Sequence, residues 1–157
     1  GGGTAETART FYAQIDALLS MARQDAPAFE VAQAIGPRAQ GFGHLAQADR
    51  KVDPGPALND LFRDADIVIS TAGYNSVLEL ATTDTPTLLV PIPRSIDDQV
   101  TRARSWAGAL GMWLDPASPE AATTWLRQEI TARRRRPPAN LGPSGEDIAA
   151  HAILGLG

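Results

Sequence analysis

The feature that most constrains this chain is a short apolar run that passes through small residues into a helix, over residues 64–79. Residues 67–69 are isoleucine, valine and isoleucine, which predicts a buried strand. Small and polar residues follow at 70–73, and we expect Asn75 or Ser76 to cap a helix that carries Glu79. Free backbone N–H groups and the positive end of the helix dipole point the same way at a helix start, so this stretch predicts an anion site.

Two interpretations of the stretch stay open on the residues alone. In the first, a phosphate lies at the helix start, and the carboxylate of Glu79 one turn further accepts hydrogen bonds from sugar hydroxyls. In the second, the segment is an ordinary capped helix of a Rossmann-type fold, and Glu79 is a solvated surface residue.

The composition narrows the class of protein. A chain of 157 residues is long enough for one domain with a proper core, and we expect a single domain over 1–157. The net charge of −4 argues against a nucleic-acid partner. Without cysteine there is no disulfide or thiolate site, and His44 and His151 lack ligand-like spacing, so we expect no metal. With no long apolar run and no signal-peptide pattern, we expect a soluble, cytoplasmic protein.

Strands and helices alternate along the predicted chain. This pattern predicts an α/β fold, a Rossmann-like parallel sheet with helices on both faces. The predicted strands are 29–35, part of 47–52, 67–69, 87–90 and 112–114. The predicted helices are 4–24, 57–63, a helix from about 75, one that the loop at 94–99 opens and that runs to about Leu110, one from Ser118 and Pro119, and a last one from Ser144 through Leu154.

Three loops are expected to meet at one edge of this sheet. The glycines at 1–3 lie just before a helix, like a turn that follows a strand, so we expect a strand before them and hence a fragment or subunit; a remnant of an added tag is the alternative. Because ligands of such sheets bind at the carboxyl ends of the strands, residues 1–3, 71–76 and 94–99 should converge there.

Four arginines at 133–136 close a predicted helix. They suit either an anionic lipid head or phosphate, or simply a solvated helix end where cations favour the dipole. We favour the solvated interpretation.

The segment T-A-G-Y-N-S-V-L-E at 71–79, then Pro86, a buried strand, Pro91 and D-D-Q at 97–99 resembles a known family. It is similar to the C-terminal, donor-binding domain of GT-B glycosyltransferases, above all the bacterial family that adds N-acetylglucosamine to a lipid-linked peptidoglycan precursor. It also resembles the signature box of plant natural-product glycosyltransferases. The resemblance covers most of the chain.

The resemblance implies metal-independent, inverting glycosyl transfer from a nucleotide sugar, with uridine diphosphate as the common carrier and no further cofactor. By the same resemblance, Glu79 binds the ribose, and Asp98 and Gln99 bind the transferred sugar. The residues implied in binding the diphosphate are Gly2, Gly3, Thr71, Gly73, Asn75 and Ser76.

The chain departs from the family pattern at Thr71, where the plant box has histidine, and at Asp84, where glycine is usual. In GT-B enzymes the catalytic base and the acceptor site belong largely to an N-terminal domain, so the resemblance assigns no catalytic residue here. It implies an N-terminal acceptor-binding domain or subunit as partner, an acceptor at a membrane surface, and a place in the cytoplasm or at the inner membrane surface.

Two other functions stay open. Nucleotide-sugar 2-epimerases resemble the same domain pair but carry extra carboxylates and a histidine near the cleft, for which His44 is the loop candidate. A non-catalytic, regulatory nucleotide-binding domain is the other. A nicotinamide-dependent oxidoreductase is disfavoured, because G-G-G-T-A-E lacks the third glycine of the dinucleotide fingerprint.

Overall fold

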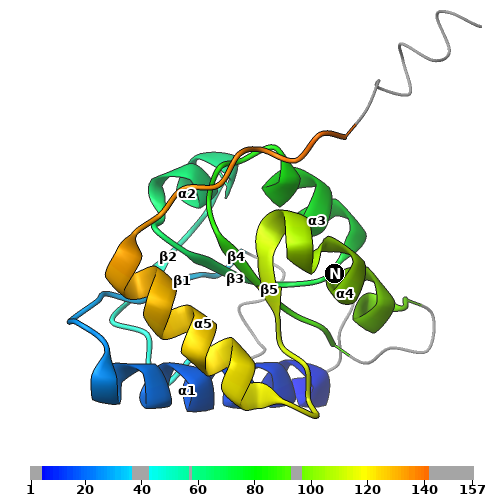
Figure 1. Cartoon of the computed structure of the whole chain (residues 1–157). Coiled ribbons are helices and arrows are strands. Elements are labelled where there is room, and N and C mark those ends of the chain that lie inside the picture. Colours follow the sequence, from blue (N-terminus) through cyan, green and yellow to red (C-terminus); the bar gives the residue numbers. More distant parts are fainter. Residues whose placement is uncertain (1–4, 37–42, 57, 93–96, 142–157) are drawn as a thin grey trace, which may run out of the picture.

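The computed structural model describes residues 5–36, 43–56, 58–92 and 97–141 (Figure 1). The glycine turn at 1–3, residues 94–96 and the helix predicted from Ser144 lie outside the described residues. No helix within the described ranges is long and apolar enough to span a membrane. The elements in order are α1 (Ala5–Asp25), β1 (Ala32–Ala34), β2 (Arg50–Val52), α2 (Leu58–Asp64), β3 (Val68–Thr71), α3 (Tyr74–Ala81), β4 (Thr87–Val90), α4 (Gln99–Leu110), β5 (Gly111–Trp113) and α5 (Pro119–Ala132).

The strands confirm the predicted α/β class with parallel pairing. β1 pairs with β2, and β3, β4 and β5 pair in that order, all in parallel. The sequence predicts one sheet, whereas the described strands form two. A cavity of about 780 Å³ separates β1 from β3.

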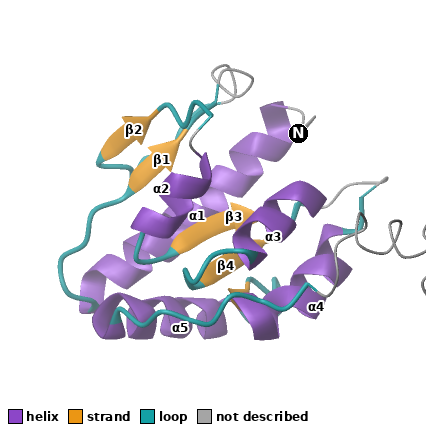
Figure 2. Cartoon of the chain, turned by 90° about the horizontal axis from the view of Figure 1, so that it is seen from above, coloured by secondary structure: helices purple, strands orange, loops and turns teal. Residues whose placement is uncertain are grey.

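The strand β4 organises the core, because both of its faces are covered by helices. Leu88 and Val90 pack with the buried side chains of α1 and α5, whereas Leu89, which points the opposite way, packs with those of α3 and α4. Figure 2 shows β3 and β4 enclosed between these helices. Helices on both faces, as predicted, therefore follow from the continuous apolar run of β4.

Gly111 ends α4 and starts β5 in one step. Its φ of +144° is open to glycine but strained for other residues. A Cβ at this position would lie 2.7 Å from the Thr87 carbonyl oxygen and 2.7 Å from Cζ2 of Trp125. Glycine is therefore required both by the turn and by the close approach of α5 to the sheet.

The arginine run corrects the solvated interpretation, because two of its members bind the fold itself. Arg136 donates from Nη2 to the Leu80 carbonyl at 2.7 Å and from Nε to the Thr85 carbonyl at 2.9 Å. Burial lowers the pKa of Arg136, and the nearby Asp84 opposes that change. The guanidinium thus satisfies a carbonyl at the C-terminal end of α3, where a cation also suits the helix dipole.

Arg135 likewise donates hydrogen bonds to backbone carbonyls, here at the C-terminal end of α2. Its Nη1 donates to the carbonyls of Arg63 and Ala65, at 3.1 and 3.0 Å, where α2 ends. Arg134 pairs with the buried carboxylate of Glu129. The basic run therefore fastens the segment after α5 across the ends of α2 and α3.

We expect Gly111→Ala to lower the free energy of unfolding by more than about 2 kcal/mol, because its Cβ collides with backbone and its φ becomes strained. Gly108→Ala is the control: it lies in α4 with no atom within 4 Å of an added Cβ, and should gain about 0.5–1 kcal/mol. Urea unfolding measures both. Equal effects of the two substitutions would contradict the packing described for Gly111.

Arg136→Gln should destabilise the chain by about 1.5–3 kcal/mol, because the carbonyls of Leu80 and Thr85 lose a charged donor. The exposed Arg133, to which the structure assigns no side-chain hydrogen bond or ion pair among the described residues, is the control. Arg133→Gln should change stability by less than about 0.5 kcal/mol. A similar loss in both variants would show that only the net charge matters.

Candidate functional site

The predicted anion site lies where β3 passes into α3, and its helix starts earlier than expected. Gly73, not Asn75 or Ser76, is the N-cap, and the Val77 N–H donates to its carbonyl at 3.0 Å. The prediction of a side-chain cap is therefore wrong: the small residues at 72–73 let the helix begin at Tyr74. Among the residues that the structure describes, no side chain caps this N-terminus, so its first-turn N–H groups can bind a ligand or water.

Two hydroxyls flank this helix start. An added Cβ on Gly73 would lie 3.7 Å from Oγ1 of Thr71 and 3.8 Å from Oγ of Ser76, so both hydroxyls border the same small surface. Asn75 is exposed in the first turn beside them. The structure thus brings together four of the predicted diphosphate ligands, and Gly2 and Gly3 lie outside the described residues.

Glu79 lies one turn further along α3, on the side of Asn75 and Ser76. It is half-buried, and within the described ranges no hydrogen bond or ion pair engages its carboxylate. A carboxylate of this kind, one turn from an anion site, can accept two hydroxyl hydrogen bonds.

The second predicted loop is tied to the first by Arg102. From Nη1, Arg102 donates to the Ala72 carbonyl at 2.8 Å and to Oδ1 of Asp97 at 2.7 Å. Its guanidinium lies 5.9 Å from the ring centroid of Tyr74, which is 64% exposed. No spacing rule in the sequence singles out Arg102, because the contact crosses between two separate βα units.

Gln99 and Asp98 have different surroundings. Gln99 is 3% exposed, accepts from the Ile92 N–H at 3.1 Å and donates to Oδ2 of Asp97 at 3.1 Å. Asp98 is exposed at the N-cap of α4, where hydrogen bonds from the Thr101 side chain and N–H lower its pKa. Their role towards a sugar stays a prediction, and the amide of Gln99 already orders this loop.

The start of α1 belongs to the same edge of the molecule. Glu6, Thr7 and Thr10 of its first turns border a hollow of about 230 Å³ together with Pro91 and Ile92, which follow β4. His44 is exposed, in a loop that the structure does not bring to this edge by any described contact. Among the described residues, no three histidine or acidic side chains are grouped so as to hold a metal ion.

Comparison with known proteins gives the site its context. The family described as glycosyltransferase family 28 C-terminal domain matches residues 2–141. The curated relatives include proteins named UDP-N-acetylglucosamine–N-acetylmuramyl-(pentapeptide) pyrophosphoryl-undecaprenol N-acetylglucosamine transferase. The one from Verminephrobacter eiseniae is 34% identical over 70% of this chain and 30% of its own length.

Two further relatives of that name match shorter stretches. The protein of Rhodospirillum centenum is 38% identical over 55% of this chain and 23% of its own length, and that of Granulibacter bethesdensis is 46% identical over 34% and 14%. The chain thus spans less than a third of the length of these relatives. No solved structure matches significantly. Because the family match covers residues 2–141, the chain belongs to the glycosyltransferase family 28 C-terminal domain family.

Proposed function

We propose that this chain is the donor-binding domain of an inverting glycosyltransferase that uses a UDP-sugar without a metal ion. Family membership supplies the reaction class. The relatives are named for transfer of N-acetylglucosamine from its UDP derivative, so UDP-N-acetylglucosamine is the first donor to test.

The observation that carries the proposal is the uncapped start of α3. Its N-cap is a glycine, no side chain in the described part of the chain caps it, and the hydroxyls of Thr71 and Ser76 border the same surface. Helix N-termini of this kind favour negative charge and supply directional donors. They suit a diphosphate, whose charge grows when it leaves.

The residues near the start of α3 are assigned to the ribose and the sugar of the donor. Glu79 accepts from the ribose hydroxyls, one turn inside α3 from the phosphates. Asp98 and Gln99 follow Asp97, which Arg102 joins to the Ala72 carbonyl. This link between the two segments supports the assignment of Asp98 and Gln99 to the transferred sugar.

The proposed reaction is a direct displacement. An acceptor hydroxyl oxygen forms a bond to the anomeric carbon, and the bond from that carbon to the β-phosphate oxygen breaks. The electron pair leaves with UDP, and the hydroxyl proton passes to a base. The base and the acceptor site come from an N-terminal domain or partner subunit. The relatives are named for an undecaprenol-linked acceptor, so a lipid-linked acceptor is proposed here too, at the inner membrane surface.

Titration of the chain with UDP, followed by NMR, tests the proposal. Shifts at 71–79 and 97–99 with UDP, absent with GDP and NADH and unchanged by EDTA, are the expected result. Equal binding of all three nucleotides, or none, would overturn it.

Gly73→Ala should weaken UDP binding without changing the stability of the fold. The φ of −64° and ψ of 148° suit alanine, and the nearest oxygens allow ordinary contact, so stability should change by less than about 0.5 kcal/mol. The methyl group nevertheless covers the surface between Thr71 and Ser76. We expect the Kd for UDP by calorimetry to rise at least about tenfold, equivalent to about 1.4 kcal/mol. Gly108→Ala, far along α4, should leave it unchanged.

Glu79→Ala should weaken UDP binding by about 1–3 kcal/mol through the loss of two ribose hydrogen bonds. The matched control removes the exposed carboxylate at the start of α5, by Glu120→Ala. Calorimetry with UDP and with 2′,3′-dideoxy-UDP decides the assignment: the Glu79 variant should no longer distinguish the two ligands. Unchanged affinity for UDP would remove Glu79 from the site.

A further inference from the structure

The start of α3 and the loop before α4 belong to separate βα units, and the side chain of Arg102 connects them. Both hydrogens of its Nη1 are used, because this nitrogen donates to the Ala72 carbonyl at 2.8 Å and to Oδ1 of Asp97 at 2.7 Å. The side chains of Arg102 and Asp97 are 23% and 31% exposed. Water therefore competes less for this pair than for an ion pair on the open surface.

The connection continues beyond Asp97. Its Oδ2 accepts from Nε2 of Gln99 at 3.1 Å, and Oε1 of Gln99 accepts from the Ile92 N–H at 3.1 Å. Ile92 follows β4 as Ala72 follows β3. One series of hydrogen bonds therefore runs from the carboxyl end of β3 to that of β4, and Arg102 is the member that reaches the β3 side.

The hydrogen bond to Ala72 also fixes the direction of the next N–H along the chain. The C=O and the N–H of a trans peptide point to opposite sides, so the Gly73 N–H points away from the guanidinium that holds the Ala72 carbonyl. Within the described ranges, no group accepts a hydrogen bond from this N–H. Because Gly73 is the N-cap of α3, its N–H adds a donor to those of the first turn.

The ring of Tyr74 restrains the guanidinium from the side of α3. Its centroid lies 5.9 Å from Cζ of Arg102, which is within cation–π distance. Tyr74 is the first residue of α3, directly after the N-cap. Arg102 therefore contacts the start of α3 through two groups, a backbone carbonyl and an aromatic ring.

We propose that Arg102 is a positioning residue for donor binding, which holds the peptide before Gly73 and the side chain of Asp97 in one arrangement. The inference rests on the proposed function and adds that the diphosphate and sugar parts of the site are coupled. Ligand contacts at 71–76 restrict the Ala72 carbonyl, and through Arg102 they also restrict Asp97 and Gln99. Occupation of one part therefore raises the affinity of the other.

NMR of the ligand-free chain tests the connection itself. Asp97→Ala should shift the Gly73 amide resonance, although the two residues lie on separate βα units. In the Arg102→Met background the same substitution should leave that resonance in place, because the series of hydrogen bonds is already broken.

Arg104→Met is the matched control on the same helix. Arg104 is exposed, its guanidinium lies 5.3 Å from the ring centroid of Trp113, and no described contact joins it to either loop. In this background Asp97→Ala should shift the Gly73 resonance as in the unaltered chain. A shift of equal size with and without Arg102, or no shift in either background, would overturn the inference.

Calorimetry with UDP-N-acetylglucosamine tests the effect on the donor. Arg102→Met should raise the Kd at least about tenfold, and Asp97→Ala added to it should raise the Kd by less than about twofold more, because both changes break one connection. Arg104→Met should leave the Kd unchanged. Losses that multiply in the double variant would show two independent contacts and would overturn the coupling.

Asp97→Ala alone serves if Arg102→Met does not fold, which urea unfolding decides. It leaves the bond to Ala72 in place and frees only the sugar segment. The Kd for UDP-N-acetylglucosamine should therefore rise at least about fivefold, and that for UDP by less than about twofold. Equal losses for the two ligands would contradict the assigned positions.

The two experiments separate this inference from the proposed function. Absence of UDP binding together with a Gly73 response that depends on Arg102 would overturn the donor function. Tight binding of UDP-N-acetylglucosamine that Arg102→Met leaves unchanged would overturn the role of Arg102 alone.

Discussion

The burial of β4 on both faces is the constraint on which the rest of the structure depends. Leu88 and Val90 face α1 and α5, and Leu89 faces α3 and α4, so four helices are positioned by three consecutive side chains. A parallel strand in this position leaves its carboxyl end at one edge of the layer, and the loops that follow β3 and β4 meet there. The position of the proposed donor site therefore follows from the burial of β4.

Hydrogen bonds between the start of α3 and the loop before α4 then hold the candidate site in place. Arg102 joins the Ala72 carbonyl to Asp97, and Gln99 joins Asp97 to the backbone of Ile92, so the start of α3 and the loop before α4 are held in one arrangement. On the opposite edge, Arg136 satisfies the carbonyl that ends α3. The guanidinium of Arg136 therefore meets the negative C-terminal end of α3, whereas no described side chain caps its positive N-terminal end, which favours an anion there.

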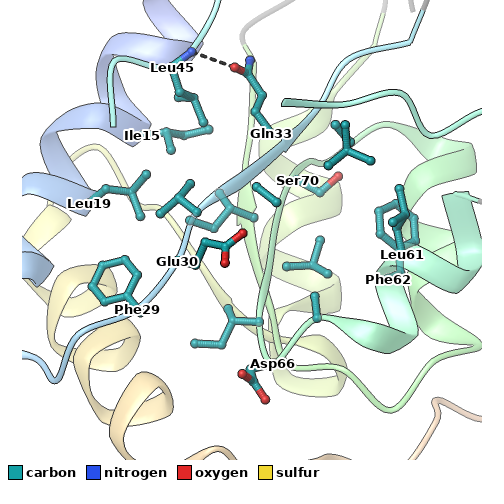
Figure 3. A pocket seen from close by; sticks show the side chains of 18 of the residues that line it. Ile15, Leu19, Phe29, Glu30, Gln33, Leu45, Leu61, Phe62, Asp66 and Ser70 are labelled. Atoms are coloured by element: carbon teal, nitrogen blue, oxygen red, sulfur yellow. Dashed lines mark hydrogen bonds between the residues drawn. The ribbon is translucent and has the colours of Figure 1, made fainter. Parts of the chain in front are cut away.

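The cavity between β1 and β3 (Figure 3) reaches the edge of the sheet where the diphosphate is proposed to bind. Thr71 and Ser76 line the cavity at that edge, and Ser70 lies beside them.

Local sequence determined the elements and most of their order, because the buried run at 87–90, the glycine at 111 and the small residues at 70–73 constrain the chain wherever it folds. It predicted that Thr71, Gly73, Asn75 and Ser76 lie together, since they share one turn. The helix start at Tyr74 and the role of Arg136 were decided only by the tertiary structure. Caps depend on backbone angles, and an arginine becomes a structural donor only when distant carbonyls, here of Leu80 and Thr85, are brought within its reach.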